Sequence, residues 1–355
     1  MYGIIDYLKE FGGYTFGEQP FNEVDALILA QFSYFKWEHV IPGIADNAEA
    51  ITLQEMKEKM YEAEVFSYEL YAEDNKKLWE VLENSRRFSS MKCNYMSEIL
   101  SESMQTQFCA FTVFLDDVYP IVLFRGTDET ILGWKEDYDM AKDLPVAGQR
   151  IAAMYLRQVA LRLDGKFITV GHSKGGNLAV YSVLDNNTNL QDRTDIIYNF
   201  DGPFFRDDIL EGLNYDRIAG KVRKFIPQSS VVGILLEKEH NYQVIYSDAM
   251  SGVTQHSPFT WVVEKDKFVY RDEVHASSRK LNEKMISLVG SLQNDQIETI
   301  GNVLFGLFQA ADITTTSELL KDKKKKASEM LKGVKNMSPE IKEQLKELIF
   351  DVKQD

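Results

Sequence analysis

The fold of this chain is decided by the stretch Val170-Gly171-His172-Ser173-Lys174-Gly175-Gly176-Asn177. An apolar run over residues 167–170 leads into it and predicts a strand, and an apolar run over residues 178–180 follows it and predicts a helix. In so tight a turn, the residues two before and two after the central serine approach each other, and Gly171 and Gly175 are small enough to do so. The pattern therefore predicts that the turn lifts the Ser173 hydroxyl off the carboxyl end of a strand.

The same turn places a backbone donor beside the serine. Lys174 opens the predicted helix, so its N–H points to where negative charge would develop on an attacked carbonyl. A second donor is expected after an earlier strand, and the turn Gly126-Thr127 can present the Thr127 N–H and hydroxyl. An ordinary capped turn explains Gly126-Thr127 equally well. The sequence thus predicts Ser173 as a nucleophile, with Lys174 and Thr127 as donors to an oxyanion.

A serine hydroxyl is a weak nucleophile and needs a general base. The chain offers five histidines, at positions 39, 172, 240, 256 and 275. In the known hydrolases that carry such a serine turn, the base follows the nucleophile in the chain and lies beyond a late strand, which leaves His240, His256 and His275. His256 is the best candidate, because it lies in a loop between two predicted strands. We expect His240 to be exposed in a charged stretch, His275 to open the C-terminal helices, and His172 to point away from Ser173 into packing.

Three regions follow one another along the chain. Residues 1–104 are predicted to form a helical portion packed on the core. In it, Asn22 can cap a helix through Phe35, and Thr52 with Glu55 forms a capping box before another helix. Residues 105–275 are predicted to form the core, and residues 276–355 a helical extension.

The central region alternates strands with helices. Runs over residues 107–114 and 118–124, separated by Asp116-Asp117, predict a hairpin. A helix around residues 151–159 is predicted before the strand that enters the serine turn. Further strands are predicted over residues 196–200, 222–226, 242–246 and 259–263. This alternation predicts an α/β fold with a mostly parallel, doubly wound sheet.

Composition narrows the possible partners. The chain has 355 residues and a formal net charge of −15, so it disfavours nucleic acid and anionic bilayers. The N-terminus lacks the pattern of a signal peptide, and the two cysteines, Cys93 and Cys109, have no zinc spacing with histidine. We expect a cytoplasmic protein with reduced thiols, no metal and no organic cofactor.

Two sets of motifs carry a family resemblance. The segment Phe124-Arg125-Gly126-Thr127 and the serine turn resemble the class 3 lipases in order and spacing. Residues 21–34, 199–203 and 255–259 further resemble a bacterial family of lipase-like proteins labelled as a domain of unknown function. The likeness spans roughly residues 1–275. It implies the α/β-hydrolase fold, Ser173 as nucleophile, His256 as base, and Thr127 with Lys174 as oxyanion donors, and it supplies no substrate.

The chain departs from the class 3 lipases in the third catalytic residue. Those lipases place an aspartate just after the strand that matches residues 222–226, where this chain reads Pro227-Gln228-Ser229-Ser230. The nearest replacement is Asp201, at the end of the preceding strand. A turn-capping role for Asp201 is equally compatible with the sequence. Asp248 and Glu237 are weaker alternatives, and a serine–histidine pair without an acid could still work more slowly.

Three segments keep alternative interpretations. The Lys174 side chain is expected to form a salt bridge with a nearby carboxylate, or else to contact an anionic part of a substrate. Residues 128–145 would form either a lid over an apolar acyl pocket or a plain surface helix. A last helix from Ser338-Pro339 carries an apolar stripe and would dock on this protein, a second copy or a membrane surface.

The function expected from these residues is hydrolysis of a carboxylic ester through an acyl-enzyme, as in a lipase or esterase. The substrate would be a small-molecule or lipid ester; membrane association is possible but not indicated. The alternative is a catalytically silent hydrolase scaffold that binds a partner through its C-terminal helices.

Overall fold

The computed structural model describes residues 2–60, 65–66, 71–101, 103, 106–127, 145–205, 207–237, 242–250 and 252–291. The strands are β1 (Ile51–Thr52), β2 (Lys92–Ser101), β3 (Thr106–Phe114), β4 (Ile121–Phe124), β5 (Phe167–His172), β6 (Thr194–Phe200), β7 (Val222–Pro227), β8 (Gln243–Ile245), β9 (Val263–Glu264), β10 (Lys267–Phe268) and β11 (Tyr270–Arg271). The helices are α1 (Ile4–Phe11), α2 (Glu23–Phe32), α3 (Leu53–Lys59), α4 (Ala72–Leu82), α6 (Ala147–Ala160), α7 (Lys174–Leu184), α8 (Thr188–Arg193), α9 (Asp207–Gly212), α10 (Asp216–Ala219), α11 (Gly252–Gln255), the 3₁₀ turn η1 (Pro258–Thr260) and α12 (Ala276–Ser291).

One mixed sheet organises the molecule. Within the described residues it has nine strands in the order β1-β2-β3-β4-β5-β6-β7-β8-β11. Its central strands β4 to β8 are parallel, and the strands at both edges are antiparallel. The predicted hairpin is present as β3 and β4, with Asp117 in the left-handed region at φ 61°. This is the α/β-hydrolase fold expected from the sequence, with a parallel centre whose carboxyl ends share one edge.

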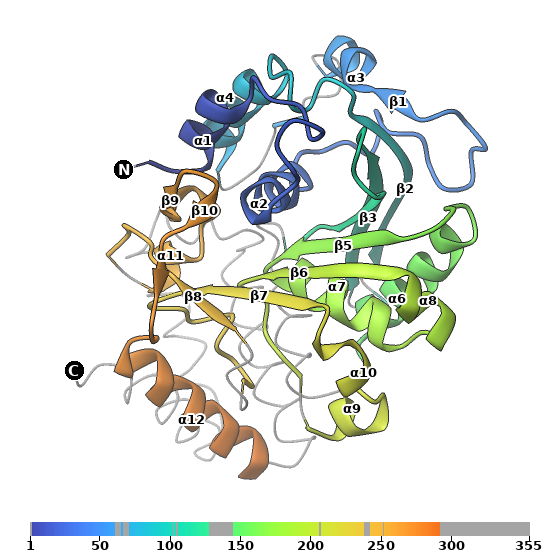
Figure 1. Ribbon diagram of the computed structural model, residues 1–355. Helices are drawn as coiled ribbons and strands as arrows, with labels where there is room; N and C mark the ends of the chain where they lie inside the picture. The colour runs from blue at the N-terminus through green and yellow to red at the C-terminus, as the bar shows by residue number, and fades with distance from the viewer. Residues whose placement is uncertain are drawn as a thin grey trace, which may run out of the picture.

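Helices cover both faces of the sheet. Successive strand residues point to opposite faces, and apolar side chains on each face pack against helices. On β3, Phe111 packs into one core with α1, α2 and α4, whereas Phe108 packs into a second core with α6, α7 and α8. Figure 1 shows α2 on one side of the sheet and α6, α7 and α8 on the other. The first face is therefore covered by N-terminal helices, and the second by the helices that connect the parallel strands.

The sheet begins earlier than predicted, because strand residues occur within the portion 1–104 that was expected to be helical. Strand β2 occupies residues 92–101 and pairs antiparallel with β3. Its register shifts between Asn94 and Ser97, and Tyr95 adopts φ 62°. This irregularity breaks the two-residue alternation by which a strand is recognised in a sequence.

The predicted strand over residues 259–263 was also wrong. The chain forms the 3₁₀ turn η1 there, and only the end of the segment enters the short β9–β10 pair. Trp261, fully buried between the two, accounts for the apolar character of the segment. The predicted caps are present: Asn22 caps α2, which ends at Phe32 rather than Phe35, and Thr52 with Glu55 forms the capping box of α3.

Several predicted features lie outside the described residues. They are most of the lid segment 128–145, His240, and the extension beyond residue 291 with its last helix. In the part of the chain that the structure describes, no helix is long and apolar enough to cross a membrane. The division into regions at residues 104 and 275 stays a prediction.

Candidate active site

The serine turn joins β5 directly to α7. Ser173 adopts φ 58° and ψ −133°, a conformation that non-glycine residues rarely adopt and that costs on the order of 1–3 kcal/mol. A Cβ added to Gly171 would lie 2.1 Å from the backbone of Gly175, and one added to Gly175 would lie 2.1 Å from the Phe124 carbonyl oxygen. The two glycines therefore have no room for a side chain, and Ser173 is raised from the strand with 8% of its surface exposed.

Asp201 stands at the corresponding end of the neighbouring strand β6. It is fully buried and adopts φ 50°, and its N–H donates to the Phe225 carbonyl at 2.8 Å. The Asn199 side chain accepts the Gly202 N–H at 2.8 Å, which closes the turn around Asp201. Asp201 Oδ2 lies 2.6 Å from His256 Nδ1. The structure thus brings together the two residues that the sequence offered as acid and base.

The other oxygen of Asp201 is also occupied. Ser230 Oγ donates to Asp201 Oδ1 at 2.6 Å, and the Gly233 N–H donates to it at 3.1 Å. Ser230 belongs to the segment in which the class 3 lipases would carry their aspartate. The space after β7 is therefore filled by a donor to the carboxylate of the preceding strand, a role that the sequence analysis did not assign to Ser230.

The two alternative carboxylates lie elsewhere. Glu237 is buried and pairs with Lys224, whose Nζ lies 2.7 Å from Glu237 Oε2. Asp248 is exposed, and its N–H donates to the Thr260 carbonyl. Of these three carboxylates, Asp201 is the one joined to His256.

His256 follows the four-residue helix α11, and its side chain is 22% exposed. Among the described residues, the hydrogen bonds of the site include Asp201–His256 but none between Ser173 Oγ and His256. Such bonds are often long in enzymes without substrate. Ser173 is nonetheless tied to the same edge, because its N–H donates to the Phe200 carbonyl, one residue before Asp201.

His172 is buried as expected, and its side chain contacts the candidate base His256. Its Nε2 lies 2.9 Å from the His256 carbonyl oxygen, and the two rings lie 4.6 Å apart between centroids. Tyr34 Oη lies 2.9 Å from His172 Nδ1. Burial, with a smaller contribution from His256, holds the pKa of His172 well below its usual range. Neither the contact with His256 nor the contact with Tyr34 was predicted, because both residues are remote from His172 in sequence.

The turn Gly126-Thr127 lies against the serine turn. A Cβ added to Gly126 would meet the His172 carbonyl oxygen at 2.6 Å, so Thr127 leaves β4 beside Ser173. Arg125, buried at the start of this turn, forms ion pairs with Glu38 and Glu98. Burial opposes ionisation of Glu38, but the Arg125 guanidinium and a hydrogen bond with Glu98 hold its pKa below the usual value. The sequence analysis did not find this cluster.

The side chains of Lys174 and His275 form hydrogen bonds with residues other than Ser173, Asp201 and His256. Lys174 Nζ donates to the Gln107 carbonyl at 2.7 Å, and the side chain is buried. His275 precedes α12, and its Nδ1 lies 2.8 Å from Ser229 Oγ. Among the residues that the structure describes, no cluster of three or more histidine, cysteine or acidic side chains could hold a metal ion.

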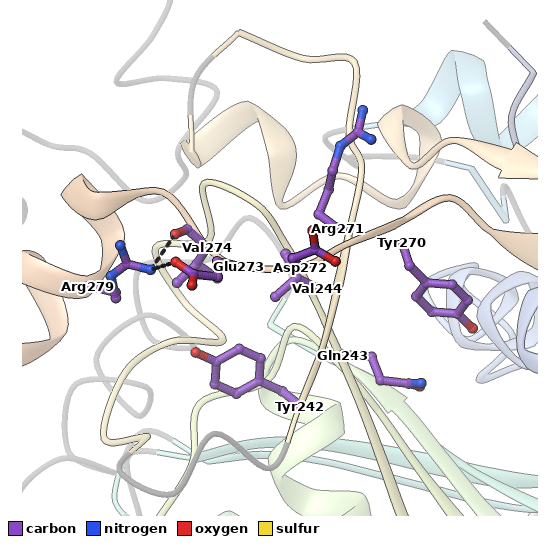
Figure 2. A pocket seen from close by; sticks show the side chains of 9 residues that line it. All are labelled: Tyr242, Gln243, Val244, Tyr270, Arg271, Asp272, Glu273, Val274 and Arg279. Atoms are coloured by element: carbon purple, nitrogen blue, oxygen red, sulfur yellow. Dashed lines mark hydrogen bonds and ion pairs between the residues drawn. The ribbon is translucent and has the colours of Figure 1, made fainter.

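A pocket of about 450 Å³ lies apart from these residues, between β8, β11 and the start of α12 (Figure 2). Its lining residues are Tyr242, Gln243, Val244, Tyr270, Arg271, Asp272, Glu273, Val274 and Arg279. Arg279 pairs with Glu273 at 2.7 Å on one wall. None of the candidate catalytic residues lines this pocket.

Three solved structures resemble this fold distantly. They are a fungal lipase–inhibitor complex (14% identity, 62% of this chain and 76% of that chain, TM-score 0.36), the M37 lipase (13%, 75% and 80%, 0.39) and a Rhizomucor miehei lipase propeptide complex (15%, 62% and 83%, 0.34). No curated protein matches the sequence. The family model described as Mbeg1-like matches residues 82–306, a span that contains the serine turn, Asp201 and His256. The chain, a lipase-like α/β-hydrolase scaffold, therefore belongs to the Mbeg1-like family.

Proposed function

We propose that this protein is a serine hydrolase that cleaves a carboxylic ester through an acyl-enzyme. The observation that carries the proposal is the 2.6 Å contact between Asp201 Oδ2 and His256 Nδ1, at the edge of the sheet where the turn raises Ser173. A buried carboxylate bound to Nδ1 fixes the tautomer in which Nε2 accepts a proton. This arrangement supports a nucleophile, a base and an orienting acid in one place.

In the first half-reaction, Ser173 Oγ attacks the ester carbonyl carbon and His256 Nε2 takes the hydroxyl proton. The carbonyl oxygen becomes an oxyanion, which accepts hydrogen bonds from the N–H groups of Lys174 and Thr127. The tetrahedral intermediate then collapses. The bond to the leaving oxygen breaks, His256 returns its proton to that oxygen, and an alcohol departs from the acyl-enzyme.

In the second half-reaction, water attacks the acyl carbonyl carbon while His256 takes one of its protons. The same two N–H groups hold the second oxyanion. Collapse breaks the bond to Ser173 Oγ, which recovers its proton from His256, and a carboxylic acid is released. The Asp201 carboxylate stabilises the imidazolium that forms twice in each turnover.

The substrate is proposed only as an ester. The net charge of −15 favours a neutral ester over a polyanionic one. Lys174 gives no support for an anionic substrate, because its amine is buried against the Gln107 carbonyl. The solved lipases are too distant to transfer their substrates, and lipid esters enter as one class to be tested. A cytoplasmic location remains part of the proposal.

A fluorophosphonate probe tests the nucleophile. We expect it to label the wild-type chain and to fail with Ser173→Ala, because an activated serine oxygen attacks the phosphorus, expels fluoride and becomes phosphonylated. Ser182→Ala is the matched control, since Ser182 lies in the same helix α7 and its hydroxyl donates to the Ala179 carbonyl. Labelling of the folded wild-type chain that persists in Ser173→Ala, or that never occurs, would contradict the proposal. The second result would favour a scaffold without catalysis.

Substrate class needs a separate measurement. Rates on p-nitrophenyl esters of increasing chain length, on thioesters and on peptides distinguish an esterase from a lipase-like enzyme, a thioesterase and a peptidase. We expect ester turnover that disappears in Ser173→Ala. Exclusive turnover of thioesters or peptides would replace the proposed reaction with another acyl transfer.

A further inference from the structure

The segment 21–34 carries part of the resemblance to a lipase-like family, yet none of its residues enters the reaction described above. The structure shows what its last residue contacts. Tyr34 lies just beyond the end of α2, and its Oη is 2.9 Å from His172 Nδ1 and 3.4 Å from the His172 carbonyl oxygen. A Cβ on Gly126 would lie 2.0 Å from the same hydroxyl. Tyr34 therefore touches both the serine turn and the turn that carries Thr127.

His172 in turn forms a hydrogen bond with the backbone of the candidate base His256. His172 Nε2 lies 2.9 Å from the His256 carbonyl oxygen. A carbonyl oxygen can only accept a hydrogen bond, so Nε2 must carry the proton. In the neutral ring Nδ1 then has a lone pair and accepts the Tyr34 hydroxyl proton. Burial holds the pKa of His172 well below its usual value, which keeps the ring neutral.

His256 needs such support, because it lies in a loop between the short α11 and the turn η1. Its ring is fixed at Nδ1 by Asp201, and its backbone carbonyl is fixed by His172. The preceding carbonyl, of Gln255, accepts the indole N–H of Trp261 at 2.8 Å. Within the described loop, His172 is the residue that joins the backbone of His256 to the serine turn itself.

We propose that Tyr34 and His172 are positioning residues that hold His256 at the height from which Nε2 reaches Ser173 Oγ. The proposal rests on the proposed function. It assigns His172 a donor role toward the His256 backbone, and it assigns Tyr34 the role of selecting the donor tautomer. A base held about 1 Å from its productive position loses much of its rate, while substrate binding is little affected.

Paired substitutions at His172 separate positioning from packing. His172→Gln retains an N–H near the position of Nε2, whereas His172→Leu retains apolar volume without a donor. We expect His172→Leu to lower kcat about 10- to 100-fold with KM within about twofold, and His172→Gln to recover kcat to within about threefold of wild type. Equal losses in both variants, or an unchanged kcat in His172→Leu, would overturn the proposal.

Tyr34→Phe tests the tautomer. Without the hydroxyl, His172 can carry its proton on Nδ1 and turn a lone pair toward the His256 carbonyl, so we expect kcat to fall about 3- to 10-fold. Tyr198→Phe is the matched control: Tyr198 is buried in β6, and in the described part of the chain its hydroxyl has no hydrogen-bond partner. A loss in Tyr198→Phe as large as that in Tyr34→Phe would overturn the assignment to Tyr34.

A measurement without turnover distinguishes failure of this proposal from failure of the proposed function. If wild type and Ser173→Ala hydrolyse every ester equally, the function fails, and the tautomer can still be read by ¹⁵N NMR of the histidine rings in Ser173→Ala. In Ser173→Ala we expect His172 to be in the neutral Nε2–H form at pH 7. In the double variant that also carries Tyr34→Phe, we expect the population of this tautomer to fall. A protonated ring or an Nδ1–H tautomer would overturn the proposal whatever the enzyme does.

Discussion

The carboxylate of Asp201 is bound on both oxygens, by His256 on one side and by Ser230 and Gly233 on the other. Each donor fixes the direction in which the carboxylate points. In the proposed reaction, the carboxylate on β6 takes the place of the aspartate that the class 3 lipases carry after the next strand, and the β7 end supplies a donor to it instead of a competing charge. Ser230 is that donor.

Asp201→Asn tests the acid at the scale of a single residue. The amide can present an N–H to His256 Nδ1 and so stabilise the wrong tautomer, and we expect kcat to fall about 10³- to 10⁴-fold. Asp248→Asn is the matched control, because Asp248 is exposed. Steady-state kinetics on an active ester decide the question. A loss below tenfold in Asp201→Asn, or a comparable loss in Asp248→Asn, would remove Asp201 from the role.

Motif and chain order are enough to nominate Ser173 and His256, because the serine turn has a local signature and the base follows it in sequence. Asp201 is predicted only as the nearest replacement for the aspartate of the class 3 lipases, and a turn-capping role is equally compatible with its sequence. Ser230 and Tyr34 could not be nominated in this way. Ser230 becomes a partner of Asp201 only when β6 and β7 lie side by side, and Tyr34 reaches His172 only when α2 packs on β5. Such contacts depend on register and packing, which have no local pattern.

At the scale of elements, the errors have the same origin. Strand β2 was not predicted, because its register shift hides the alternation of buried and exposed residues. A strand was wrongly predicted around Trp261, because a buried 3₁₀ turn can be as apolar as a strand. The elements with local signals were predicted well. The caps at Asn22 and Thr52 and the hairpin of β3 and β4 each depend on residues close in sequence.

The cap of α2 has a measurable effect on stability. Asn22 Oδ1 accepts the Val24 and Asp25 N–H groups at 2.9 and 3.2 Å, and its amide donates to the Tyr7 hydroxyl. We expect Asn22→Ala to lower the free energy of unfolding by about 1–2 kcal/mol, measured by denaturant titration. Asn22→Asp, which keeps the cap oxygen, should lose less. A change in Asn22→Ala smaller than about 0.3 kcal/mol would contradict a stabilising cap.

At the scale of the whole molecule, the N-terminal helices are part of the sheet's packing rather than an appendage. They contribute side chains to the same core as β3, β4 and β5, and Tyr34 extends from them to the candidate active site. The candidate active site therefore forms only when the N-terminal helices pack on the sheet. A buried ion pair also lies among these N-terminal residues: Arg87 Nη2 is 2.5 Å from Asp25 Oδ2.

The same coupling makes stability depend on pH through His172. Burial lowers the pKa of His172 in the folded chain from the usual 6.5. Below about pH 6.5 the imidazole therefore binds a proton in the unfolded chain and stays neutral in the folded chain. Stability from this group is therefore complete above pH 6.5 and is lost as the pH falls toward the folded pKa, by at most about 1.4 kcal/mol per pH unit. Protonation of carboxylates also relieves the net charge of −15 over this range, so the wild-type profile alone is not diagnostic.

The difference between variants isolates the His172 contribution. We expect the free energy of unfolding of wild type to fall between pH 7 and pH 5.5 by about 1 kcal/mol more than that of His172→Gln, which has no group to protonate there. His39→Gln, at an exposed histidine, should follow the wild-type profile. Denaturant titrations at matched ionic strength provide the three curves. Parallel curves for wild type and His172→Gln would mean that His172 accepts a proton in the folded chain, where both ring nitrogens are donors and Tyr34 selects no neutral tautomer.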